Sequence, residues 1–127
     1  MSFGYALRKF REGRGLTLRE LGTLCGIDHA YIHRLEKDEK TSPSEQVMES
    51  LVKNLKLNAR RSRMLRFLIG KKADEPLIDV FLEDEERPIE VFESLVSMSF
   101  RGKRPDDKDS WQKWADRLQE LMSEQGK

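Results

Sequence analysis

Two helix-start patterns on either side of a glycine constrain the fold of this chain more than any other feature. In the segment Leu16–Lys37, Thr17 and Glu20 have the spacing of a capping box, in which a hydroxyl and a carboxylate satisfy the open N–H groups at a helix start. Gly26 permits the left-handed backbone that ends a helix, and Asp28 can cap the next one. The sequence therefore predicts two short helices joined by a tight turn.

Apolar spacing and further capping residues predict three more helices in the first half of the chain. Apolar residues recur at three and four positions over 3–12. Ser42 or Ser44 can cap a helix with its apolar residues over 47–55, and Asn58 can cap another that reaches residue 69. We expect these five helices to form one domain over residues 1–72.

The second half is expected to be a smaller, mainly helical region over residues 73–127. Residues 77–82 suggest a short helix, although their pattern also suits a strand, and residues 89–100 have helical spacing. Asp109 or Ser110 is expected to cap a final helix with a wide apolar stripe over 111–122. The predicted fold class is all-α throughout.

Charge divides the chain at the same place. The whole chain has a net charge of +1, but residues 1–72 carry +8 and residues 73–127 carry −7. A basic domain suits a polyanion, because each phosphate that it neutralises releases counterions.

The order of parts resembles the lambda repressor/Cro-like family of helix-turn-helix proteins, often called the XRE type, over about residues 1–70. The parts are a basic first helix FGYALRKFREGRG, then LRELGTLCGI, the helix DHAYIHRLEK, and SPSEQVMESLVKNLKLN. This resemblance implies a five-helix domain that binds double-stranded DNA. It further implies that the helix at residues 28–37 reads base edges in the major groove.

The resemblance assigns the base-reading positions to the exposed side of that helix. Arg34 can bond both acceptors of guanine, and His29 can donate or accept a hydrogen bond. Tyr31 offers apolar contact or a hydroxyl, although Tyr31 and His33 could instead pack against a neighbouring helix. The candidates for base reading are His29, Ala30, Tyr31, His33 and Arg34.

Residues at helix ends and in the loop that follows can hold phosphates through hydroxyls, cationic groups and open backbone amides. The phosphate candidates are Thr17, Arg19, Lys37, Lys40, Thr41 and Ser42.

Four further positions bear on the resemblance. Many relatives have glutamine where this chain has Leu18, so its phosphate anchoring must differ there. Gly22 replaces the usual alanine where the two motif helices cross, and Arg11 and Glu36 match positions that form an ion pair in relatives. We interpret that pair as structural.

A homodimer is expected, because one recognition helix reads few base pairs and relatives bind two-fold sites. Two surfaces are candidates for the dimer or partner interface: the fifth helix and the final helix. Their residues are Met64, Leu65, Leu68, Ile69, Trp111, Trp114 and Leu118. For the two tryptophans, packing within their own chain is the competing interpretation.

Composition argues against several other classes of protein. One cysteine permits no disulfide within the chain, and no apolar run approaches the roughly 20 residues that span a bilayer. No catalytic nucleophile, phosphate loop or cofactor site is recognisable. Cys25, His29 and His33 are spaced by four, but Gly26 interrupts the helix between them, so no metal site is predicted. We expect a cytoplasmic protein that is not an enzyme and has no membrane partner.

Two functions follow from these expectations. The first is a sequence-specific transcriptional regulator, a repressor rather than an activator, that binds two-fold operators. The alternative is an antitoxin or adaptor, whose C-terminal half binds a protein partner while the helix-turn-helix controls its own operon. In a third possibility, the acidic half competes with DNA for the basic half.

Overall fold

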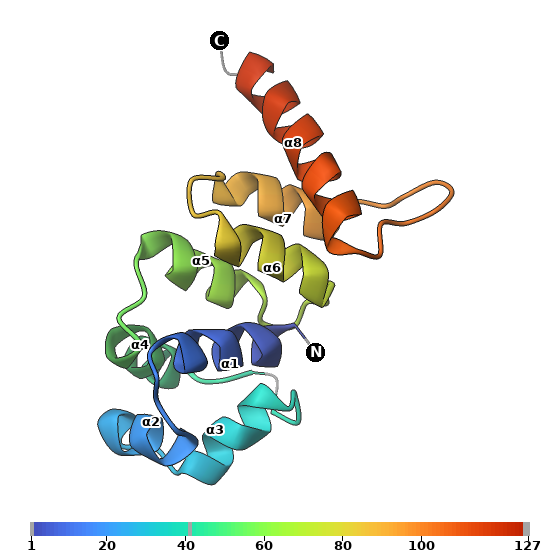
Figure 1. Ribbon diagram of the computed structural model, residues 1–127. Coiled ribbons are helices and arrows are strands. Elements are labelled where there is room, and N and C mark those ends of the chain that lie inside the picture. Colours follow the sequence, from blue (N-terminus) through green and yellow to red (C-terminus); the bar gives the residue numbers. More distant parts are fainter. Residues whose placement is uncertain (1, 41, 126–127) are drawn as a thin grey trace. The chain divides into compact units, whose positions relative to one another are not determined.

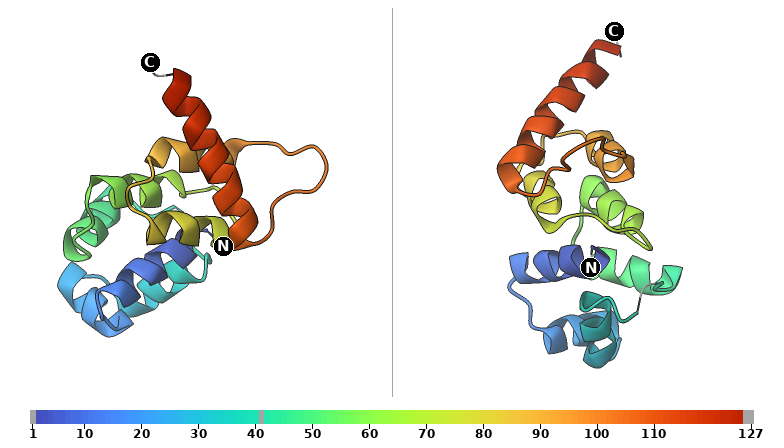
Figure 2. Two further views of the ribbon diagram at one scale, coloured as in Figure 1. Left: turned by 45° about the horizontal axis from the view of Figure 1, so that its top comes forward. Right: turned by 90° about the vertical axis from the view of Figure 1, so that its right-hand side faces the viewer.

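The computed structural model describes residues 2–40 and 42–125 of the chain. These residues form eight helices and no strand, so the predicted all-α class is confirmed. The chain divides into two compact units, Met1–Lys72 and Ala73–Lys127. Figure 1 colours the first unit blue to green and the second olive to red, and Figure 2 gives two further views.

Side-chain caps begin four of the five helices of the N-terminal unit. Thr17 and Glu20 form the predicted capping box, with both hydrogen bonds at 3.0 Å, and the bond from the Thr17 backbone N–H lowers the pKa of the Glu20 carboxyl. Asp28, Ser44 and Asn58 cap the next three, so Ser44 rather than Ser42 has this role. The helices are α1 (Phe3–Gly13), α2 (Leu18–Cys25), α3 (His29–Glu36), α4 (Glu45–Asn54) and α5 (Ala59–Phe67).

Every helix of this unit contributes apolar side chains to a common core. Burial of each large aliphatic or aromatic side chain stabilises the fold by about 1.5–3 kcal/mol. The fully buried residues from α1 to α4 include Leu7, Leu21, Ile32, Leu35, Met48 and Leu51.

Two glycines permit helices to approach more closely than any other residue would allow. A Cβ atom on Gly22 would lie 2.7 Å from the Ile27 carbonyl oxygen, so even the alanine of related sequences would not fit here without a shift. A Cβ on Gly4 would overlap the carbonyl group of Glu36. These contacts bring α1 and α2 against the two ends of α3.

The C-terminal unit contains α6 (Glu75–Glu83), α7 (Ile89–Ser97) and α8 (Lys108–Gln125). Residues 77–82 are helical, so the strand alternative does not occur. The predicted caps Asp109 and Ser110 are wrong. Asp107 caps α8 instead: its carboxylate accepts from the Ser110 backbone N–H at 2.7 Å, which lowers its pKa. Residues 107–110 include several side chains able to cap, and Lys108, in the first turn of α8, forms an ion pair with Glu83 of α6.

A small aromatic and aliphatic core joins these three helices, with α8 packed on both α6 and α7. The rings of Phe81 and Phe92 meet edge to face at 5.3 Å, and Trp111 of α8 is fully buried. Arg87, in the loop between α6 and α7, reaches Asp116 of α8 at 2.7 Å. Within the described residues, no helix has the length and apolar character needed to cross a membrane.

Substituting alanine for Gly4 is expected to destabilise the protein by about 1–3 kcal/mol, because the new methyl group would press against backbone that cannot move alone. The matched control is Gly13→Ala in the same helix, where a Cβ meets nothing within 4 Å and helix propensity improves. Urea denaturation followed by circular dichroism would measure both. Equal stability of the two variants would contradict the close packing of α1 on α3.

Candidate nucleic-acid interface

One side of α3 faces solvent while the other is packed in the core. Ile32 and Leu35 are fully buried, whereas His29, Ala30, His33 and Arg34 are exposed. The last three follow His29 by one, four and five residues, spacings that place all four on one side of a helix. Tyr31 is half-buried at the edge of this face. The structure thus brings all five predicted base-reading positions onto or beside one accessible surface.

The turn before α3 is stabilised by the same residues from which it was predicted. Gly26 has φ 67° and ψ 32°, in the left-handed region, and the Ile27 backbone N–H donates to the Gly22 carbonyl at 2.9 Å. The Asp28 carboxylate accepts from the Ala30 backbone N–H at 2.9 Å and lies 3.8 Å from Nδ1 of His29. The start of α3 is therefore defined by hydrogen bonds on both sides of the turn.

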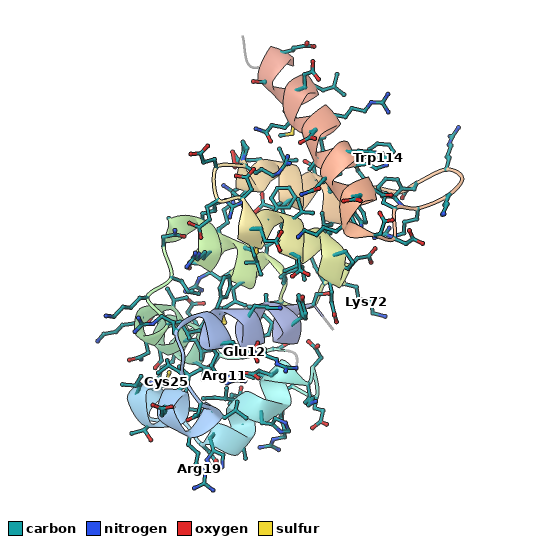
Figure 3. All side chains as sticks on the ribbon, viewed as in Figure 1. Arg11, Glu12, Arg19, Cys25, Lys72 and Trp114 are labelled. Carbon is teal, nitrogen blue, oxygen red and sulfur yellow. The ribbon has the colours of Figure 1, made fainter. Side chains whose placement is uncertain are left out.

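A surface hollow of about 300 Å³ opens between α2 and α3 and unites two kinds of predicted site residue. Its lining includes Arg19, a phosphate candidate, and His29, a base-reading candidate. Thr23 also lines the hollow and was not predicted, although it lies one turn after Arg19 and helical spacing places both on one face. Arg19 itself extends into solvent (Figure 3).

The other phosphate candidates are distributed around this face. Thr17 uses its hydroxyl oxygen to cap α2, which leaves its O–H proton free to be donated to a phosphate. Lys37, Lys40 and Ser42 are exposed at the end of α3 and in the loop after it. Thr41 lies outside the described residues.

A nearly buried ion pair holds the far end of α3 against α1. Arg11 donates from Nε and Nη2 to the two carboxylate oxygens of Glu36, at 2.7 and 3.0 Å, and from Nη1 to the Leu16 carbonyl at 2.9 Å. Only 13% of the Arg11 side chain and 4% of the Glu36 side chain are exposed. The hydrogen bonds to Glu36 raise the pKa of Arg11. One guanidinium thus links α1, α3 and the loop before α2.

The same end of α3 caps α1. Asp38, just past α3, has a positive φ of 58° and accepts from the Gly4 backbone N–H at 3.1 Å. This bond satisfies a donor that is open at every helix start. The orientation of the exposed face of α3 is therefore set by contacts with α1 at one end and with α2 at the other.

Cys25 belongs to the packing between α2 and α4. It is half-buried rather than fully buried, and its Sγ donates to the Ser50 carbonyl at 3.7 Å while the Ser50 hydroxyl donates back to the Cys25 carbonyl. In the part of the chain that is described, no three His, Cys, Asp or Glu residues come close enough to hold a metal ion.

The predicted interface residues differ in accessibility. Met64, Leu65, Leu68 and Trp111 are fully buried and expose no side-chain surface to a partner. Ile69, Trp114 and Leu118 are half-buried. Of the candidates on the first surface only Ile69 is accessible, whereas the final helix keeps both Trp114 and Leu118 accessible.

Comparisons with known proteins agree with this geometry. Residues 2–64 match a protein family described as "Helix-turn-helix domain". Over 56 residues the chain is 38% identical to the HTH-type transcriptional repressor RghR of Bacillus subtilis, an alignment that covers 44% of this chain and 42% of that protein. The chain thus spans less than half of this relative. These matches confirm the predicted resemblance and make the exposed face of α3 the candidate DNA-contacting surface.

Removing the Arg11 guanidinium is expected to loosen α3. Arg11→Met should destabilise the protein by about 2–4 kcal/mol, because Glu36 would remain as an unpaired, nearly buried carboxylate. Arg8→Met in the same helix is the control, since its pair with Glu12 is exposed and worth well under about 1 kcal/mol. Thermal unfolding would compare them. A loss no larger for Arg11 than for Arg8 would show that the pair does not hold α3.

Proposed function

We propose that this chain, whose residues 2–64 match the helix-turn-helix family, is a DNA-binding transcriptional regulator that represses from two-fold operator sites as a homodimer. The observation that carries the proposal is the exposed face of α3, with hydrogen-bonding side chains at His29, His33 and Arg34 on a helix anchored at both ends. The proposed activity is binding, not catalysis. A protein with this function would act in the cytoplasm, where it binds DNA.

In this function α3 enters the major groove. Arg34 reads guanine through its two acceptors, His29 and His33 bond neighbouring base edges, and Ala30 lets the helix approach the bases closely. Tyr31, at the edge of the face, contacts a thymine methyl or a phosphate. These contacts specify sequence only because α3 is held rigidly by α1 and α2.

Phosphate contacts position the unit without reading sequence. Thr17, Arg19 and Thr23 lie beside the start of α3, and Lys37, Lys40 and Ser42 lie beyond its end, so two stretches of backbone can be held at once. The net charge of +8 over residues 1–72 supports this role and predicts affinity that falls steeply with salt.

Dimerisation follows from the size of the recognition surface. One α3 helix reads only a few base pairs, and two copies related by a two-fold axis would read half-sites about 34–36 Å apart. The similar Bacillus protein is named as a repressor, which supports repression rather than activation of transcription.

An antitoxin or adaptor function is the alternative. It is supported by the compact C-terminal unit, which has its own core and carries a net charge of −7. In this function, residues 73–127 would bind and neutralise a protein partner while the N-terminal unit represses the shared operon. A protein that binds this chain in a fixed stoichiometry, and that no longer binds after exposed residues in 73–127 are substituted, would favour this function over the first.

The proposed function is tested by selecting randomised duplex DNA with the purified chain at moderate salt and sequencing what is retained. The expected result is a two-fold repeated motif with half-sites about one helical turn apart. No enrichment by a folded protein would count against a sequence-specific regulator.

Arg34→Ala is expected to weaken binding to the selected site by about 1–3 kcal/mol and to relax the preference at one base pair, with little effect on random DNA. The control is Arg101→Ala, which removes the same charge from an exposed loop of the C-terminal unit. Fluorescence anisotropy titrations would measure both variants. An equal loss on selected and random DNA would make Arg34 a phosphate contact instead.

A further inference from the structure

The final helix presents an apolar stripe that its own unit does not fully cover. Leu121 is 50% exposed, and the other mostly exposed large apolar residue within the described residues is Leu24 in α2. Trp114 and Leu118 are half-buried and lie on the same side of α8 as Leu121, because they precede it by seven and three residues. We call these three residues the α8 stripe. The C-terminal half of α8 extends beyond α6 and α7 in every view (Figures 1 and 2).

A hollow adjoins the stripe at its tryptophan. It measures about 310 Å³ and is lined by Lys113, Trp114 and Arg117. The Trp114 ring meets the ring of Phe100 edge to face, with centroids 5.1 Å apart and an interplanar angle of 84°. The stripe thus offers a supported aromatic surface at one end and an exposed leucine at the other.

Four exposed charged residues form a row directly beside the stripe. Lys113, Arg117, Glu120 and Glu124 follow one another at intervals of four, three and four residues, which keeps them on one side of the helix. The row is basic toward the start of α8 and acidic toward its end. Within the described residues, none of the four has an ion-pair partner within 4 Å.

This order of charges does not stabilise α8 by itself. Two of the three neighbouring pairs in the row, Lys113 with Arg117 and Glu120 with Glu124, are like-charged and destabilise the helix, which outweighs the one opposite pair, Arg117 with Glu120. Acidic residues near the end of a helix also oppose its dipole. A second helix that runs in the opposite direction would reverse the effect, because it would place acidic residues beside the basic half.

We propose that the α8 stripe and its row of charges form the homodimer contact, in which α8 pairs antiparallel with α8 of a second copy of this chain. A two-fold axis near residues 118 and 119 places Lys113 opposite the partner's Glu124 and Arg117 opposite the partner's Glu120, each pair occurring twice. Leu118 and Leu121 then meet the same residues of the partner near the axis. A parallel pairing would oppose like charges, so the row selects the antiparallel arrangement.

The two leucines of the α8 stripe and the charged row agree on the position of this axis. Leu118 and Leu121 are centred one residue away from the centre of the charged row, which is a shift of only about 1.5 Å along a helix. The inference rests on the proposed function, since it assigns the surface of the homodimer proposed there. It uses residues of α8, whereas the proposed DNA contacts use residues of α2, α3 and the loop after α3.

The test measures self-association of the full chain in the absence of DNA, by sedimentation equilibrium and light scattering. The wild-type chain is expected at twice its 14.9 kDa mass. Leu121→Glu should weaken the dimer by at least about tenfold, since it places two carboxylates near the axis. The matched control is Leu24→Glu, which changes the comparably exposed leucine of the N-terminal unit and should leave the dimer intact.

Charge reversal tests the pairing itself. Arg117→Glu and Glu120→Arg should each weaken the dimer by about tenfold, because each creates two like-charged contacts across the axis. The double variant R117E/E120R restores opposite charges and should return to within about threefold of the wild type. Both positions are exposed, so helicity measured by circular dichroism should not change in any of the three variants.

The proposal is overturned by a monomeric wild-type chain, by a Leu121→Glu dimer as tight as the wild type, or by a double charge variant no tighter than the single variants. DNA selection separates this result from the proposed function. An enriched two-fold site with a dimer insensitive to Leu121 would refute the α8 pairing alone. A dimer that Leu121→Glu disrupts, without any enriched site, would refute DNA reading alone.

Discussion

The placement of α3 depends on the ion pair between Arg11 and Glu36. The guanidinium uses three of its N–H groups on Glu36 and on the Leu16 carbonyl, so it joins three segments of the chain at one point. Taking these charges out of water is costly, and the bidentate geometry offsets that cost while it excludes other arrangements. Without it, Ile32 and Leu35 would still be buried in the core, but the end of α3 would lose its charged link to α1.

Close packing completes what the ion pair begins. Gly22 lets the start of α3 lie against α2, and Gly4 lets the end of α3 lie against α1, at distances that a Cβ atom would prevent. A DNA-reading helix needs this rigidity, because base discrimination relies on hydrogen bonds whose geometry tolerates little displacement. The two glycines contribute no side-chain packing, but the close contacts that they permit fix one orientation of α3.

The division of charge supports the different roles proposed for the two units. The basic N-terminal unit suits a polyanion, and the acidic C-terminal unit would be repelled by one, so its surfaces are better suited to protein contacts. Within that unit, Arg87 forms an ion pair with Asp116 and so ties the loop between α6 and α7 to α8. The charged row of α8, by contrast, has no ion-pair partner among the described residues. That contrast separates charges that serve the fold from charges available to a second molecule.

Local sequence determined where most helices begin and which face of α3 is exposed. Capping requires only residues three positions apart, as with Thr17 and Glu20, and burial of Ile32 and Leu35 follows from helical spacing. Tertiary structure decided the rest. The hollow beside Arg19 formed where α3 packs against α2, and Met64, Leu65 and Leu68 were removed from the surface. These outcomes depend on contacts between segments far apart in the sequence, which a local pattern does not encode.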